Sequence, residues 1–445
     1  MPLTQIICAV IVCVALVGGI VHAQQAPATA SQLRLMVGAP PPPHRQVNLG
    51  NFMRAPFNRW SYQHIRELLP TRAVARGESV AALPAQPTDL SSLEVKLDDE
   101  RTETVAHFLE RSYTDAFIVL HDGVVVYERY FNDQTPDVRH LMFSVTKSFT
   151  GTLALMLIEQ GLIDPKRVVG DYVPELKASA FADATVQQLL DMTNSIDFDE
   201  TYTDPNSDIA RFVAAFGTPA AFGEPDSHGA GAGSIYSYLQ TLVAHDPHFG
   251  HGEAFHYVTA DPEVLGWIIR RVTHKNLAQV LSEMIWQKLG VEADGYYWLD
   301  AQGTEMAGGG LNITLRDAAR FGQMILDDGR FNNQQIVSSA VAQRIKQAGV
   351  PDVFAKYYEE PWYHQVGYAY HDQWWTFKNA DHAVSALGVY GQYIYIDPIA
   401  HVVIVKQTSD PDAEGATNDV DGPVVLNAIA QHLHGGAQAP QEPRR

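Results

Sequence analysis

A serine and a lysine spaced three residues apart, Ser144 and Lys147, are the side chains in this sequence best suited to covalent chemistry. Ser144 stands where a long apolar helix is expected to begin, and Gly161 is expected to end that helix. Because residues three apart lie on one helix face, the Ser144 hydroxyl and the Lys147 amine can meet. A buried Lys147 would lose affinity for its proton and could activate Ser144 as a base. The other interpretation is an N-capping serine followed by a surface lysine, which is a common pattern.

Two later segments could supply the other groups that such a serine needs. Tyr257 lies in a glycine-rich loop just before a helix expected from about Asp261, where a phenol can relay the serine's proton to a leaving group. Gly388 would let a strand backbone approach closely, so the N–H of Val389 could join that of Ser144 in an oxyanion hole. The alternatives are a packed aromatic side chain at Tyr257 and a β-bulge at Gly388.

These three motifs, in this order and with these separations, resemble those of the serine β-lactamase and penicillin-binding-protein superfamily. The similarity is strongest to its class C-like branch, which includes the 6-aminohexanoate-dimer (nylon oligomer) hydrolases and related carboxylesterases. It covers about residues 105–430, and the leader region from Pro40 also looks like that of the nylon-oligomer hydrolases. The specific segments are FSVTKSF, LLDMTNSIDFDETYTDPNSD and GVYGQYIYIDP.

The resemblance implies a role for each matching residue. Ser144 would be the acylated nucleophile, Lys147 its base and Tyr257 the proton relay, with the N–H groups of Ser144 and Val389 binding the oxyanion. Tyr202 would help to hold the substrate amide. Further substrate contacts are expected from Thr259, Gly388 and Tyr390. The resemblance implies no cofactor and no metal.

The sequence departs from the family pattern at two motifs. β-Lactamases carry Lys-Thr-Gly at the third motif, where the lysine binds the carboxylate of the drug, but this chain has Ala386-Leu387-Gly388. The second motif is usually Tyr-x-Asn, and here Thr259 replaces the amide. Both changes argue against β-lactam or D-Ala-D-Ala substrates, whereas the groups needed for hydrolysis remain. We therefore expect a serine hydrolase that cleaves a small linear amide or ester.

Three questions stay open at this stage. β-Lactamase or D-Ala-D-Ala carboxypeptidase-like activity is one alternative, and a catalytically silent binding protein on the same fold is another. The choice between amide and ester is open as well, and so is the oligomeric state.

The secondary-structure signals come mainly from the two ends of the main domain. An Asp-Gly turn inside residues 117–130 and the segment 392–405 each predict a β-hairpin. Strands at both ends with helices between them predict an α+β fold of the β-lactamase/transpeptidase type, with one antiparallel sheet built from both ends, flanked by helices and carrying an inserted helical lobe. Helices are expected at about residues 144–160, 185–192, 263–273, 276–288, 315–328 and 423–434.

The chain divides into five predicted segments. Residues 1–23 read as a signal peptide, because the apolar run from Ile6 to Ile20 precedes Val21-His22-Ala23. The mature protein would then begin near Gln24, lack cysteine, and be periplasmic or secreted; an uncleaved signal anchor is the alternative. The remaining segments are a Pro-rich linker and packed extension (24–100), the hydrolase domain (101–434, with the helical lobe at about 165–300) and a polar tail (435–445).

Charge and histidine content limit the partners. The formal net charge of −20 argues against nucleic acid and against an anionic membrane surface. The partner that the resemblance implies is a small-molecule amide or ester substrate. Four histidines between His245 and His256 invite a metal hypothesis. Pro247, Gly250 and Gly252 make this segment a loop, so we expect a solvated or substrate-facing loop instead.

Overall fold

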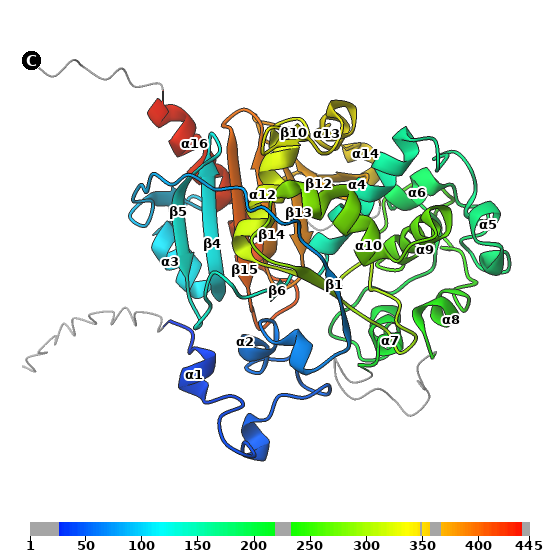
Figure 1. Cartoon of the computed structure of the whole chain (residues 1–445), viewed down its shortest axis with the longest axis horizontal. Coiled ribbons are helices and arrows are strands. Elements are labelled where there is room, and N and C mark those ends of the chain that lie inside the picture. Colours follow the sequence, from blue (N-terminus) through cyan, green and yellow to red (C-terminus); the bar gives the residue numbers. More distant parts are fainter. Residues whose placement is uncertain (1–25, 219–232, 348, 357–365, 438–445) are drawn as a thin grey trace, which may run out of the picture.

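A seven-stranded antiparallel sheet forms the centre of the molecule (Figure 1). The computed structural model describes residues 26–218, 233–347, 349–356 and 366–437. The strand order is β11-β12-β13-β14-β15-β4-β5, so the first and last parts of the domain meet where β15 pairs with β4. The predicted α+β fold class is confirmed. The strands are β4 (Thr114–His121), β5 (Val124–Tyr130), β11 (Tyr368–His371), β12 (Trp374–Phe377), β13 (Val384–Gly388), β14 (Gln392–Asp397) and β15 (Val402–Thr408).

Both predicted hairpins are present, and local chemistry explains their turns. Asp122 and Gly123 between β4 and β5 both have positive φ, of 50° and 75°, as a tight two-residue hairpin turn requires. Between β14 and β15, the Asp397 carboxylate accepts hydrogen bonds from the N–H groups of Ile399 and Ala400. These turns set the register of the strands that meet at the sheet centre.

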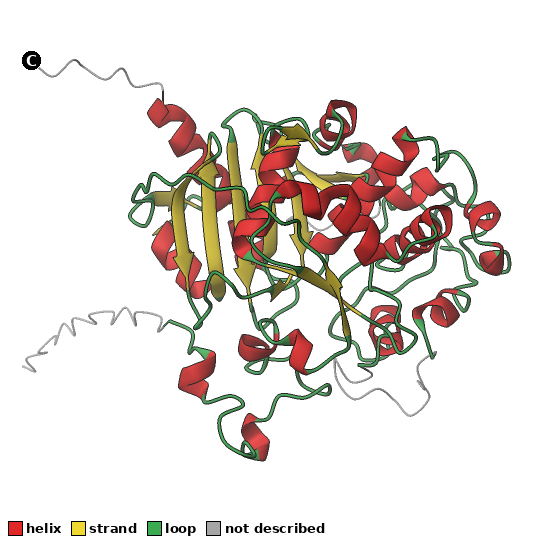
Figure 2. Cartoon of the chain, in the orientation of Figure 1, coloured by secondary structure: helices red, strands yellow, loops and turns green. Residues whose placement is uncertain are grey.

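Alternate side chains of β4 enter two different hydrophobic cores. Ile118 and Leu120 face the core that contains helices α4 (Val145–Glu159) and α12 (Leu315–Leu326). Phe117 and Val119 face the core that contains helices α3 (Val105–Arg111) and α16 (Gly422–Ala437). The sheet is therefore buried on both faces, which explains the continuous apolar run of β4. Figure 2 shows the sheet with helices on both sides.

A helical lobe extends from one side of the sheet and packs on α4 through α9 (Figure 1). The predicted helix over 276–288 is divided by a π-helical turn at Ser282–Trp286. The helices of the lobe are α5 (Val169–Tyr172), α6 (Val186–Leu190), α7 (Asp208–Ala215), α8 (Ile235–Leu239), α9 (Asp261–Thr273), α10 (Leu277–Leu281) and α11 (Gln287–Leu289), with a 3₁₀ turn at Pro174–Leu176.

A second, smaller sheet, which the sequence analysis missed, contains the short strand that precedes Ser144. Its order is β1-β7-β8-β6. Its strands are β1 (Thr71–Val74), β6 (His140–Leu141), β7 (Gly295–Trp298) and β8 (Leu311–Ile313). The smaller elements are β2 (Glu94–Lys96), β3 (Thr102–Thr104), β9 (Arg330–Phe331), β10 (Gln334–Gln335), α13 (Ser339–Ile345), α14 (Pro351–Phe354) and a π-helical turn at Thr417–Asp421.

The N-terminal extension contacts strand β6, which precedes Ser144. Helix α2 (Asn58–Ser61) ends at Ser61, whose buried hydroxyl donates to the Phe52 carbonyl. Tyr62 follows, fully buried, and its carbonyl accepts from the Leu141 N–H of β6. The extension also contains α1 (Ala30–Leu33) and 3₁₀ turns at Pro43–Arg45 and Ile65–Glu67.

The ends of the chain add little to the structural description. The predicted signal peptide of residues 1–23 and residues 438–445 of the predicted tail lie outside the described residues. Within the described part of the chain, every helix is too short or too polar to span a bilayer.

Candidate active site

Ser144 occupies a tight strand-to-helix turn at the start of α4. Strand β6 ends at Leu141, Phe143 takes a left-handed conformation with φ 46°, and Ser144 is the N-cap position of α4. Its side chain makes no capping hydrogen bond, so its Oγ is not committed to the helix backbone. The interpretation of Ser144 as an ordinary capping serine is therefore wrong.

Lys147 lies one turn along α4 and points back to Ser144. Its Nζ lies 2.8 Å from Ser144 Oγ and 2.9 Å from the Gly308 carbonyl oxygen. The side chain is buried rather than on the surface, and burial lowers the pKa of Lys147 to about 8. Gly308 is required at its position, because an added Cβ would come within 2.9 Å of Pro262 and 3.1 Å of the Thr259 carbonyl.

The end of β13 lies against the turn that carries Ser144. A Cβ added to Gly388 would lie 2.6 Å from the Met142 carbonyl and 3.1 Å from the Ser144 nitrogen. Only glycine allows this approach, and it brings the peptide that joins Gly388 to Val389 beside the Ser144 N–H. The structure therefore brings together the two residues whose N–H groups the sequence suggested as oxyanion donors.

Tyr257 lies on the other side of Lys147. The Lys147 Nζ is 5.0 Å from the centroid of the Tyr257 ring, which itself stacks on Trp375 at 5.7 Å. Tyr257 and Ser144 both line the same cleft. The Tyr257 ring is thus close to Lys147 and shares the cleft with Ser144.

Glu200 is a half-buried carboxylate in this site that the sequence analysis did not single out. Its Oε1 accepts from the Tyr202 hydroxyl at 2.7 Å and from the Thr259 hydroxyl, and its Oε2 accepts from the Thr259 N–H at 3.1 Å. Burial raises the pKa of Glu200, and the hydrogen bonds to its charged form oppose that rise. Thr259, expected to contact substrate, instead directs its hydroxyl to Glu200.

Tyr390, another expected substrate contact, packs against the turn that carries Ser144, on the side away from the cleft. It is buried, with its ring centroid 5.0 Å from that of Phe143 and 5.4 Å from that of Tyr62. Its place is explained by the N-terminal extension, which supplies the aromatic surface on which it packs. Tyr390 supports the turn that carries Ser144 instead of lining the cleft.

The cleft in front of Ser144 has a volume of about 760 Å³. Aromatic rings form part of its wall, and two acidic loops, 197–203 and 412–419, form its rims. Among the described residues that line it, none is Lys or Arg, so the lining offers an anionic substrate group no lysine or arginine as a partner. The lining carboxylates are Asp197, Asp199, Glu200, Asp412, Glu414 and Asp419.

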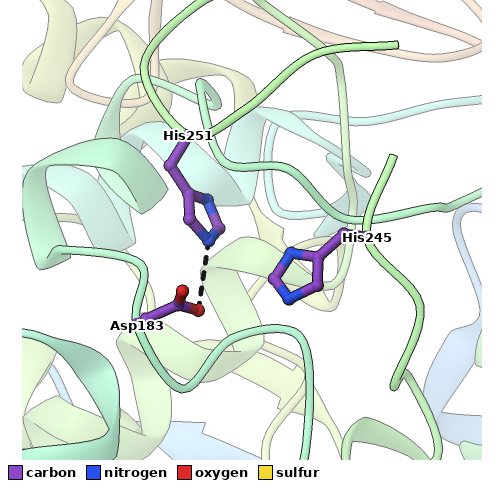
Figure 3. Close-up of side chains that lie close together, drawn as sticks. All are labelled: Asp183, His245 and His251. Atoms are coloured by element: carbon purple, nitrogen blue, oxygen red, sulfur yellow. Dashed lines mark hydrogen bonds and ion pairs between the residues drawn. The ribbon is translucent and has the colours of Figure 1, made fainter. Parts of the chain in front are cut away.

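Two of the four loop histidines, His245 and His251, lie close to Asp183 (Figure 3), and both contact the backbone of Ser195. His251 Nδ1 accepts from the Ser195 N–H at 2.8 Å, and His245 Nδ1 lies 3.0 Å from the Ser195 carbonyl. A neutral His251 ring must then carry its proton on Nε2, which lies 3.3 Å from Asp183. A protonated Nε2 has no lone pair to bind a metal. These hydrogen bonds therefore indicate that His245 and His251 hold the Ser195 backbone in place.

The comparisons with known proteins identify the class of this chain. The sequence profile of the beta-lactamase family matches residues 102–421. The chain belongs to the beta-lactamase family, and its fold is of the β-lactamase/transpeptidase type.

Individual relatives narrow the comparison. The 6-aminohexanoate-dimer hydrolase of Paenarthrobacter ureafaciens is 37% identical over 376 residues, which cover 83% of this chain and 90% of the relative. A solved structure from Bacillus anthracis, named after the same hydrolase, is 32% identical with a TM-score of 0.77, covering 90% of this chain and 100% of that one. The hydrolase EstCE1 shares the fold at 16% identity, with a TM-score of 0.55 over 72% of this chain and 98% of its own.

Proposed function

We propose that this protein is a serine hydrolase that cleaves small linear amides or esters through an acyl-enzyme on Ser144. The observation that carries the proposal is the 2.8 Å contact between Lys147 Nζ and Ser144 Oγ at the wall of a cleft. A buried amine whose pKa burial has lowered can accept the proton of a neighbouring hydroxyl. The similarity to the 6-aminohexanoate-dimer hydrolase supports this reaction class.

The reaction proceeds in two halves. Lys147 takes the Ser144 proton as Oγ attacks the carbonyl carbon, and the N–H groups of Ser144 and Val389 bind the oxyanion that forms. As the intermediate collapses, the carbon–heteroatom bond breaks, and Tyr257 relays the proton from Lys147 to the leaving amine or alkoxide. Water then adds to the acyl-enzyme with the same groups, which releases the acid and returns the proton to Ser144.

The cleft supports a substrate without a carboxylate. Its lining provides carboxylates but no Lys or Arg among the described residues. Ala386, where β-lactamases carry a lysine, is fully buried and packs in the core that contains α4, whereas Leu387 lines the cleft. An Ala386→Lys variant would bury a charge at this position and is therefore not a usable test of carboxylate binding.

A hydrolysis panel tests the proposed function. It contains a linear amide, a short-chain aryl ester and a chromogenic cephalosporin, with Ser144→Ala as the control enzyme. We expect turnover of the ester or the amide by the wild type and none by the variant. A silent binding protein on this fold would hydrolyse nothing in the panel.

The pH dependence should report Lys147. Because only the neutral amine can take a proton, kcat/KM should rise with pH, about tenfold per unit, and level off above the Lys147 pKa of about 8. The measurement is kcat/KM of a neutral aryl ester between pH 6 and 9.5. A profile already flat at pH 6 would assign the base to a carboxylate or histidine instead.

We also propose that the protein is exported, on the basis of the apolar run before Val21-His22-Ala23. N-terminal sequencing of the protein from its native cell should return a chain that begins near Gln24, in a periplasmic or secreted fraction. A soluble cytoplasmic protein that begins at Met1 or Pro2 would contradict this.

A further inference from the structure

The carboxylate of Glu200 connects the loop that carries Tyr202 to the loop that carries Tyr257, beside the proposed base Lys147. Tyr202 on its own loop and Thr259 on the loop of Tyr257 both donate to it, through the tyrosine hydroxyl and through the threonine hydroxyl and N–H. Glu200 also lines the cleft. A single side chain therefore fixes the position of Tyr202 relative to the segment that carries the proposed proton relay.

Glu200 is also one of three acidic groups that act on Lys147. The others, Asp261 and Glu263 at the start of α9, are engaged elsewhere: Asp261 accepts from the Asn194 amide, and Glu263 accepts from the N–H groups of Ala307 and Gly308. All three raise the pKa of Lys147 against the effect of burial, Glu200 most of all. The ring of Tyr257 also faces the amine, with its centroid 5.0 Å from Lys147 Nζ.

We propose that Glu200 is a positioning residue of the hydrolytic reaction, which holds the Tyr257 loop and stabilises the ammonium form of Lys147 through its charge. This inference rests on the proposed function. When Lys147 accepts the Ser144 proton, the new positive charge forms in a buried site, where an opposite charge has its largest effect. Thr259 stands where the second motif of the family has an asparagine, and Glu200 is hydrogen-bonded to Thr259. At this position the chain thus acts on the reaction through the charge of Glu200 and not through an amide that contacts the substrate.

If the charge of Glu200 acts on Lys147, its removal should shift the pH profile of kcat/KM, whereas a purely structural role of Glu200 predicts no such shift. Removing an opposite charge favours the neutral amine, so Glu200→Gln should move the acid limb of kcat/KM to lower pH, by about one unit. The same change leaves the transition-state ammonium less stabilised, so the plateau at high pH should fall by about tenfold or more.

Thr259→Val is the matched control. It removes one hydrogen bond to Glu200 but keeps the carboxylate. Any fall in its plateau therefore comes from looser positioning, and its acid limb should stay where the wild type has it. If Glu200→Gln does not fold, Glu200→Ala replaces it, and added formate should restore the position of the limb by supplying the missing charge.

The experiment measures kcat/KM of a neutral aryl ester from pH 6 to 9.5 for the wild type and each variant. A limb that moves down in Glu200→Gln and stays in Thr259→Val supports the inference. A limb that is unmoved or moves up in Glu200→Gln overturns it, whatever happens to the plateau. If the wild type itself shows no Ser144-dependent hydrolysis, the proposed function fails instead, so the two failures are distinguishable.

Discussion

Replacing Ser144 by alanine is expected to lower kcat/KM for an aryl ester by about three orders of magnitude or more, because the loss of a nucleophile removes the covalent route altogether. The fold should survive. Ser144 makes no capping hydrogen bond, and the Lys147 amine keeps the Gly308 carbonyl as a partner. We expect the free energy of unfolding to change by less than about 2 kcal/mol.

Ser148→Ala is the matched control for this variant. Ser148 lies one turn further along α4, is also buried, and donates to the Gln373 carbonyl away from the cleft. Its loss should reduce stability without removing turnover. If Ser144→Ala kept more than about a tenth of wild-type kcat/KM, Ser144 would not be the nucleophile.

The second large effect concerns the charge of the substrate. We expect kcat/KM for a neutral short-chain aryl ester or linear amide to exceed that for a cephalosporin by about 100-fold or more. A missing charge-assisted hydrogen bond costs about 1.5–3 kcal/mol, which is about 10- to 150-fold, and the missing amide of the second motif should slow deacylation of the cephalosporin as well. The described lining offers the cephalosporin carboxylate no cation, and it places Asp412 and Glu414 on the rim. The same aryl ester with and without a terminal carboxylate isolates the charge from the ring chemistry.

The acidic rim can be tested by a pair of variants. Asp412→Asn with Glu414→Gln should narrow the gap between the neutral and the carboxylate ester, and raised ionic strength should do the same by screening. Asp99→Asn with Glu100→Gln removes the same charge at exposed positions outside the cleft lining and serves as the control. Cephalosporin turnover equal to that of the best ester would show that carboxylate recognition comes from elsewhere.

What the sequence could predict follows from short-range geometry. The Ser144–Lys147 contact depends only on helical periodicity, and the β4–β5 hairpin depends on Asp122 and Gly123, so both could be predicted from neighbouring residues. The small sheet could not, because strands of two to four residues give almost no periodic signal.

Functional residues that depend on distant contacts were also harder to find. Glu200 acquires its place from Thr259, which comes much later in the chain, and no local pattern predicts that hydrogen bond. Tyr390 follows the glycine of the third motif, as a cleft residue would, yet aromatic packing on Tyr62 holds it behind the nucleophile. Such placements depend on tertiary contacts, and these are not encoded in spacing.

The most direct measurement of the central claim is covalent labelling of the intact protein with a fluorophosphonate, followed by peptide mapping. The contact of Ser144 Oγ with Lys147 predicts one adduct, on Ser144, and none in the Ser144→Ala variant. An adduct on another residue, or no mass shift in protein that still hydrolyses the ester, would contradict the account.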